Sequence, residues 1–330
     1  MIEQYFPKSV RYFLGIFAIA AFLIGIVGAL LRKDSAGNVI LSALEAAILA
    51  AIGGFIARSF IRFLLQLGRD SANAALVIGW GFFLWPGIFD TVARLFGKQY
   101  ATRPAVLLWI AISVGSFTGM MDGMWQTHNW VGLGAPAFIL DETWGLAGTT
   151  NGDLLHIFNF IPGDHAVGET RTDAHRYNKG FAVKPGFAFT QGAVMSSNDN
   201  DRTTPLFAHE NTHVWQNRLV GPLYTLSYIG WMLLLLIPGL LAGLISKKGV
   251  NEGITDWSYF NNPWEAMGYD VGKGHGASAR TSFGTLIWSD AAVYISGGIY
   301  FALALALAVF IVYRVWFRQA AGSPALAVGY

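Results

Sequence analysis

Five consecutive residues, His209-Glu210-Asn211-Thr212-His213, combine residue types and spacing that could bind a metal ion and use it. On a helix, the two histidines lie one turn apart on the same face, so both imidazoles can reach a single zinc ion. Glu210 directly follows the first histidine and could act as general base toward a water molecule on the zinc. The pattern therefore predicts a zinc site with His209 and His213 as ligands and Glu210 as a catalytic residue.

The residues on either side of the motif predict that it lies on a helix. Thr204 supplies a hydroxyl that can cap the first turn, and Pro205 occupies the first helical position, where the lack of an N–H costs nothing. Gly221 and Pro222 then end the segment. The two histidines are therefore expected on one face of a helix that lies between these signals.

A catalytic zinc site needs a third protein ligand and leaves one position open for water. Glu265 is the best candidate, because Asn262 can cap and Pro263 can begin a second helix that carries Glu265 in its first turn. The spacing of Asn262 and Glu265 is also that of a capping box, in which Glu265 would bind a backbone N–H instead. The histidines that compete with Glu265 for the third position are His156, His165, His175 and His275.

The composition is that of a membrane protein. Hydrophobic residues make up 54% of the chain and charged residues only 13%, whereas soluble domains carry about 25% charged residues. Much of the chain is therefore expected to contact membrane lipid. The sequence has no basic run, which argues against nucleic acid as a partner. It also has no cysteine, which excludes disulfides, iron–sulfur clusters and thiolate zinc sites.

Six apolar segments are long enough to span the roughly 30 Å hydrocarbon core of a bilayer. They comprise residues 12–31, 39–57, 72–89, 104–121, 223–245 and 291–313. The first is flanked by basic residues and is not followed by a small-residue cleavage site, so we interpret it as a retained anchor. The pattern predicts a polytopic α-helical membrane protein, integral and multi-pass, with five or six transmembrane helices.

Between residues 122 and 222 the apolar runs shorten, and Gly, Asn, Asp and Thr recur every few residues. Residues 154–160, 181–183 and 187–195 are typical of short strands separated by turns. We expect a soluble α+β insert that ends in the motif helix. The expected order is a four-helix transmembrane region at 1–121, the insert at 122–222, a transmembrane or re-entrant helix at 223–245, a polar segment with the third-ligand helix at 246–290, and a C-terminal transmembrane helix and tail at 291–330.

Two stretches of the sequence carry a resemblance to a known family. The first is Phe181-Ala-Val-Lys-Pro-Gly-Phe-Ala-Phe-Thr-Gln-Gly192, and the second is Leu206-Phe-Ala-His209-Glu-Asn-Thr-His213. Together they resemble the gluzincin clan of zinc metallopeptidases, and most closely the membrane-integrated group that includes the CAAX prenyl proteases. The resemblance covers residues 175–270 and implies that the insert is zincin-like.

The resemblance also implies roles for individual residues. Zinc would be held by His209, His213 and Glu265, and Glu210 would serve as general base and proton shuttle. Residues 187–195 would form an edge strand to which an extended peptide substrate adds.

The sequence departs from the family pattern at two positions. Asn211 stands where an aliphatic residue usually packs beneath the zinc, and Tyr269 stands where an acidic residue is common, with Asp270 one position later. Such neighbours orient the imidazole ligands and tune the acidity of bound water. Tyr269 and His275 are further catalytic candidates, because either could donate a hydrogen bond to a tetrahedral oxyanion.

The assignment of Glu265 conflicts with one possible topology. If residues 223–245 cross the membrane, His213 and Glu265 lie on opposite sides, because the stretch between them then contains no apolar segment able to return. Pro238-Gly239 would instead permit a re-entrant helix pair. In that arrangement the basic residues near the segment ends divide seven to five between the two sides, which favours a non-cytoplasmic polar insert.

Two functions fit these features. The first is an integral-membrane zinc endopeptidase that cleaves polypeptide substrates near the membrane surface. The second is a non-catalytic zincin-like subunit that packs against partner membrane subunits in a larger complex. A transporter has less support, because Glu45 is the only acidic residue within an apolar segment. Glu45 is either a buried functional carboxylate or a partner in a helix-end or interhelical hydrogen bond.

Overall fold

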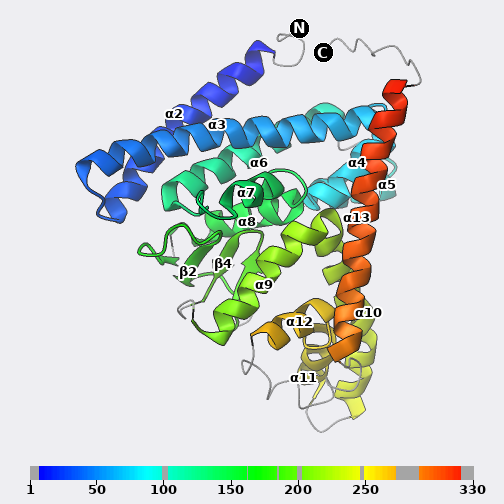
Figure 1. The fold of residues 1–330 in the computed structure, drawn as a ribbon. Helices are drawn as coiled ribbons and strands as arrows, with labels where there is room; N and C mark the ends of the chain where they lie inside the picture. Colours follow the sequence, from blue (N-terminus) through cyan, green and yellow to red (C-terminus); the bar gives the residue numbers. More distant parts are fainter. Residues whose placement is uncertain are drawn as a thin grey trace. The chain divides into compact units, whose positions relative to one another are not determined.

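The computed structural model describes residues 7–98, 103–161, 163–183, 186–198, 203–245, 249–272 and 290–320, and in the last helix it describes side chains from 294 to 314. Figure 1 shows a chain built mainly of helices, with one small sheet. The chain divides into two compact units. The first comprises Met1–Asp153, Val167–His175 and Ala306–Tyr330, and the second comprises Leu154–Ala166 and Arg176–Leu305.

Three long helices form the framework of the first unit, namely α2 (Lys8–Leu31), α3 (Ala36–Leu67) and α6 (Pro104–Trp125). Where α3 crosses α6, Gly53 faces Gly115, and a Cβ on either glycine would collide with the carbonyl oxygen of the other. Small residues at such crossings allow close backbone packing, which is how helices commonly associate in lipid.

Residues 72–89, predicted as one apolar span, form two helices instead, α4 (Ala72–Phe82) and α5 (Trp85–Leu95). Between them Leu84 has a φ of 65°, which takes the chain out of helical conformation. Pro86 disfavours helix in the residue before it and cannot donate to the preceding turn, so α4 does not continue. The 11 residues of α4 rise only about 16 Å, too little to cross a bilayer.

Among the residues that the structure describes, five helices are long and apolar enough to cross a membrane, judged by their length and composition. They are Lys8–Leu31, Ala36–Leu67, Pro104–Trp125, Pro205–Ile245 and Tyr294–Arg314. The chain therefore has the helices expected of a multi-pass membrane protein. The fourth of these helices joins the motif segment directly to an apolar segment.

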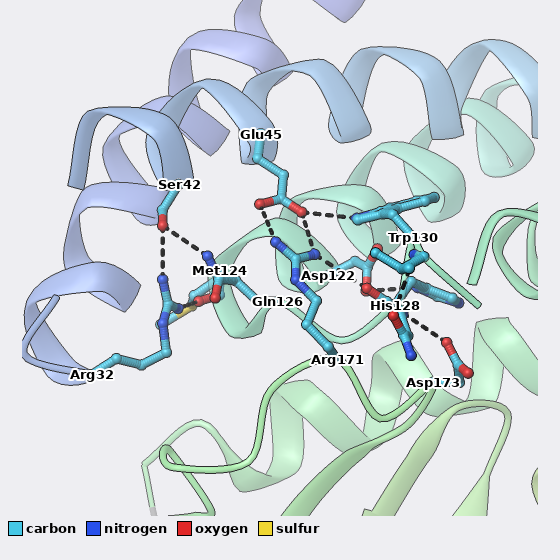
Figure 2. A network of polar contacts seen from close by, with 12 residues as sticks. Arg32, Ser42, Glu45, Asp122, Met124, Gln126, His128, Trp130, Arg171 and Asp173 are labelled. Carbon is cyan, nitrogen blue, oxygen red and sulfur yellow. Dashed lines mark hydrogen bonds and ion pairs between the residues drawn. The ribbon is translucent and has the colours of Figure 1, made fainter. Parts of the chain in front are cut away.

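A network of polar side chains ties α3 and the C-terminal end of α6 to neighbouring loops of the first unit (Figure 2). Glu45 accepts two hydrogen bonds from Arg171, at 2.5 and 2.8 Å, and one from the indole of Trp130 at 3.0 Å. Ser42 accepts a hydrogen bond from Arg32 at 3.0 Å. Glu45 of α3 is therefore a hydrogen-bond partner in a polar network that joins α3 to neighbouring loops.

Two shorter helices follow α6, namely α7 (Gly134–Asp141) and α8 (Leu146–Asn159). The prediction of a strand at residues 154–160 is wrong, because most of these residues form the C-terminal part of α8. Their apolar run fits a strand and a buried helix equally well. The first half of α8 is rich in Gly, Thr and Asn, and this composition hides the helical pattern from sequence reasoning.

A small sheet precedes the motif helix. Its strands are β1 (Asp164–His165), β2 (His175–Lys179), β3 (Phe189–Gln191) and β4 (Val194–Ser196), in the order β1-β2-β4-β3. The single strand predicted at 187–195 is a hairpin of β3 and β4, because Gly192 turns the chain with a φ of 53°. Residues 181–183 are not a strand. Strand β3 lies at the edge of the sheet.

The motif helix α9 (Pro205–Val220) begins and ends where the sequence predicts. The Thr204 hydroxyl accepts a hydrogen bond from a backbone N–H in the first turn at 3.3 Å, and Gly221 leaves the helix with a φ of 59°. A 3-10 turn, η1 (Gly221–Leu223), then joins α9 to the apolar helix α10 (Tyr224–Ile245).

After α10 the chain returns along the same helix. The short helix α11 (Val250–Ile254) and the π-helical segment η2 (Thr255–Tyr259) pack against α10. A Cβ on Gly243 would lie only 2.6 Å from the Cα of Val250, so glycine is required at this contact. The return brings the chain to α12 (Pro263–Val271), which removes the expected obstacle to placing Glu265 near the motif.

The hairpin of α10 with α11 and η2 predicts that residues before α9 and after the start of α12 lie on one side of the membrane. Thr203 and Val271 are both exposed, and the chain has no cysteine. Single Thr203→Cys and Val271→Cys variants should therefore react with an impermeant thiol reagent from the same side. Labelling after permeabilisation gives the total reactive thiol, and reaction from opposite sides would contradict the re-entrant arrangement.

Candidate metal centre

Helices α9 and α12 of the second unit bring His209, His213 and Glu265 together. The Nε2 atoms of the two histidines are 3.1 Å apart. Oε2 of Glu265 lies 3.2 Å from Nε2 of His209, and Oε1 lies 3.4 Å from Nε2 of His213. All three side chains are buried. Within the part of the chain that the structure describes, this is the only group of three such ligands that could hold a metal ion.

The spacing of the three ligands fits zinc. A tetrahedral zinc ion with bonds of about 2.0–2.1 Å separates its ligand atoms by roughly 3.3 Å, close to the 3.1, 3.2 and 3.4 Å seen here. Two imidazole nitrogens 3.1 Å apart cannot both carry a hydrogen toward each other, so at least one of them presents a lone pair to the site. The donors are two nitrogens and a carboxylate, a set that zinc accepts in sites with one open position.

Glu265 faces the histidines and does not complete a capping box. Asn262 caps α12 by accepting from the N–H of Trp264 at 3.2 Å, but the N–H of Asn262 itself donates to the carbonyl of Tyr259 at 2.9 Å. The Glu265 carboxylate instead accepts a hydrogen bond from the Tyr228 hydroxyl at 2.5 Å. Burial alone would raise the pKa of Glu265, but the two histidines hold it well below its usual range, so the carboxylate is ionised.

Gln216 fixes the orientation of His213. Its amide nitrogen donates to the carbonyl of Trp264 at 3.2 Å, so its oxygen faces Nδ1 of His213, at 2.9 Å. Nδ1 therefore carries a hydrogen that it donates to Gln216, and Nε2 faces the centre of the site. The sequence offered one signal for this role, because Gln216 lies three residues after His213 on the same helical face.

Gly268 makes room for His209. A Cβ at Gly268 would lie 2.9 Å from both Cε1 and Nδ1 of the His209 imidazole. The ring of Tyr269 covers the same imidazole, with ring centroids 4.3 Å apart. The imidazole is thus held between the backbone of α12 and an aromatic ring. Sequence reasoning did not identify Gly268, because a helical glycine carries no signal of what packs on it.

Glu210 lies beside the triad but does not belong to it. Its side chain is buried, and Oε2 accepts a hydrogen bond of 2.6 Å from the Thr190 hydroxyl. Thr190 belongs to the edge strand β3. The candidate base Glu210 is therefore hydrogen-bonded to the edge strand β3, where an extended peptide could add as a further strand.

The other predicted catalytic residues have different positions. The Tyr269 hydroxyl lies 3.5 Å from that of Tyr259. Burial first, and then the charge of Glu265, raise the pKa of Tyr269, so its hydroxyl keeps its hydrogen and can donate. Asp270 accepts a hydrogen bond from Tyr294. His275 lies outside the described residues.

The histidines that competed with Glu265 are held elsewhere. Nδ1 of His156 lies 2.8 Å from the Tyr177 hydroxyl, and burial lowers the pKa of His156 to about 3. The ring of His165 packs on Tyr177 with centroids 4.4 Å apart. His175 stacks on Trp125 with centroids 4.9 Å apart. In the described structure none of these three joins the group formed by α9 and α12.

No protein-family model, curated protein or solved structure matches this chain.

Zinc content tests the triad. Purified protein should hold about one zinc per chain, because three ligands with this spacing satisfy the ion. His209→Ala and His213→Ala should each abolish binding, and Glu265→Gln should weaken it. His165→Ala is the matched control and should keep its zinc. Metal analysis of each variant provides the measurement, and full zinc retention when both motif histidines are replaced would contradict the site.

Gly268→Ala tests whether α12 positions His209. The added methyl should push the imidazole out of line and weaken zinc binding by about tenfold or more, comparable to the loss of a supporting contact at other metal sites. A Cβ added at Gly230 would meet nothing within 4 Å, so Gly230→Ala controls for the general cost of adding a methyl group. Competition with a chelator measures the affinity, and equal affinities in the two variants would contradict the positioning role.

Proposed function

We propose that the protein is an integral-membrane zinc endopeptidase that cleaves peptide bonds close to the membrane surface. The observation that carries the proposal is the contact between Glu210 and Thr190. It ties a buried carboxylate, next in sequence to one candidate ligand, to the open edge of a sheet. A metal triad, a base and an edge strand are the parts that hydrolysis of an extended peptide requires.

In this proposal His209, His213 and Glu265 would hold a zinc ion. Zinc, when bound, polarises the scissile carbonyl and lowers the pKa of water to about 7. Gln216 keeps Nε2 of His213 directed at the site, and Gly268 allows His209 to approach. In this proposal the protein holds its metal-binding side chains in position before the metal ion binds.

Glu210 performs the proton transfers. It accepts a proton from the attacking water and delivers it to the nitrogen of the departing amine. The hydroxyl of Thr190 engages Oε2 of Glu210, which leaves Oε1 for the transferred proton and fixes the plane of the carboxylate. Tyr269, whose hydroxyl stays protonated, supplies a hydrogen bond to the oxyanion that forms during attack.

The edge strand β3 binds the substrate as an added strand. The free N–H and C=O groups of an edge strand pair with an extended peptide whatever its side chains are. Because Thr190 lies within β3, a peptide aligned on that strand passes beside Glu210. This alignment favours an extended, unfolded segment of a polypeptide as the substrate.

The link from α9 to α10 supports a substrate close to lipid. Only the short turn η1 separates the motif helix from α10. The exposed residues of α10 include Leu233, Leu234, Ile237 and Leu241, which suit contact with acyl chains. The site is thus connected through η1 to a helix with an apolar surface. The non-cytoplasmic placement of the polar insert stays a prediction.

Glu210→Gln separates binding from catalysis. The variant should keep its zinc, because Glu210 is not a ligand, and lose peptidase activity by at least about 100-fold, the usual effect of removing a general base. The assay uses the zinc-loaded full chain in lipid nanodiscs, with peptides that join an apolar anchor to an extended polar segment. Glu252 is exposed, so Glu252→Gln is the matched control and should remain active.

Two outcomes would contradict the proposal. Unchanged cleavage by Glu210→Gln would exclude Glu210 as the general base. Absence of cleavage by the zinc-loaded wild type, together with stoichiometric copurification of other membrane subunits, would favour the accessory-subunit function instead.

A further inference from the structure

Another buried carboxyl group, that of Glu142, lies in the first unit. Glu142, at the C-terminal end of α7, is 0% exposed, and Asp153 of α8 is 6% exposed. Within the described structure neither Oε1 nor Oε2 of Glu142 has a hydrogen-bond partner. An ionised carboxylate in such a position would be strongly unfavourable, because it has lost water and gained no donor.

The Glu142 carboxyl occupies the space that two glycines leave open. A Cβ on Gly53 of α3 would lie 3.0 Å from Oε1, and one on Gly115 of α6 would lie 2.7 Å from Oε2. The carboxyl therefore packs against the glycine backbone at the place where α3 and α6 cross. No donor faces the carboxyl there in the described structure, which suits a neutral acid and not an anion.

The charges that act on Glu142 are all negative. They come from Asp153 of α8, Asp141 of α7 and Asp122 of α6, and together with burial, which is the larger cause, they raise the pKa of Glu142 well above its ordinary value. Burial also raises the pKa of Asp153, although a hydrogen bond from Thr118 opposes the shift. That hydroxyl lies 2.9 and 3.0 Å from the two oxygens of Asp153 and can donate to only one of them.

The positive groups nearby are committed to other acids. Nδ1 of His128 lies 2.7 Å from Asp122, and its Nε2 lies 3.2 Å from Asp141. Burial would lower the pKa of His128, but these two carboxylates raise it to about 9, so the ring is a cation that serves both. On α3, Glu45 is paired with Arg171 (Figure 2). Among the described residues, the pair of Glu142 and Asp153 is thus left without a counter-ion of its own.

A divalent metal ion does not fit this place. Apart from the triad of α9 and α12, no three His, Asp or Glu side chains in the described ranges bring ligand atoms close enough to hold one ion. A proton needs much less, because a single carboxyl oxygen binds it covalently and removes the charge. Either oxygen of Glu142 can hold it.

We propose that Glu142, with Asp153, forms a proton-binding site in the first unit, and that release of the proton weakens the contact between α3 and α6. The proton takes the place of the missing counter-ion. When it leaves, a carboxylate charge remains against the glycine crossing, where no donor in the described structure stabilises it. The proposal is independent of the zinc site.

Infrared spectroscopy of the full chain in lipid nanodiscs tests proton occupancy directly. At neutral pH the wild type should show the C=O stretching band of a protonated carboxylic acid, and Glu142→Gln should lose it. Asp153→Asn should shift or weaken the band, since it removes the neighbouring charge, and it keeps the test open if Glu142→Gln does not fold. Glu252→Gln, at an exposed position, should leave the band unchanged. Absence of a band specific to Glu142 would overturn the proposal.

Thermal unfolding against pH tests the energetic consequence. A carboxyl whose folded pKa exceeds its unfolded value of about 4.3 stabilises the fold fully below that value and loses this contribution as the pH rises toward the folded pKa. The Tm of the wild type should therefore fall as the pH rises above about 5, more steeply than that of Glu142→Gln. Equal slopes of Tm against pH in the wild type and Glu142→Gln would overturn the proposal. A Tm that sodium restores at high pH, but a bulky organic cation does not, would also overturn it, because the site would then bind a metal cation.

Discussion

The antiparallel packing of α11 and η2 on α10 is the constraint on which the metal centre depends. Glu265 is far from the motif in sequence, and an apolar helix separates them, so the third ligand reaches the histidines only because the chain turns back along α10. Gly243 permits this turn, since a Cβ there would lie 2.6 Å from the Cα of Val250. Glycine contacts of this kind allow helices to pack where the hydrophobic effect offers little, as in lipid.

Glu265 and Glu142 show how the same side chain adopts opposite states in similarly dry surroundings. Both are buried. Glu265 faces two imidazoles, which hold its pKa far below the ordinary value, so it stays an anion and can ligate a metal. At Glu142 burial raises the pKa first and the neighbouring acids raise it further, so in the proposed site it holds a proton. Burial thus favours the neutral form of both carboxyls, and the two imidazoles reverse this only at Glu265.

The parts that could be predicted from sequence are those with local causes. Thr204 and Gly221 fix the ends of α9 through capping and a positive φ, and both act within a few residues. The failures involve segments whose structure depends on distant contacts or on a single turn residue. The strand expected at 154–160 is helical, and the one expected at 187–195 folds back at Gly192. Gln216 and Gly268 could not be assigned their roles, because these depend on the packing of α12 against α9.

The hydrogen bond from Thr190 to Glu210 connects recognition with chemistry in the proposed peptidase. Thr190 lies on the edge strand, and its hydroxyl sets the direction of the Glu210 carboxylate at 2.6 Å. A peptide that pairs with β3 would lie on the strand that carries this hydroxyl, so the same strand would align the substrate and orient the base. Selection for extended substrates would then follow from the backbone pairing.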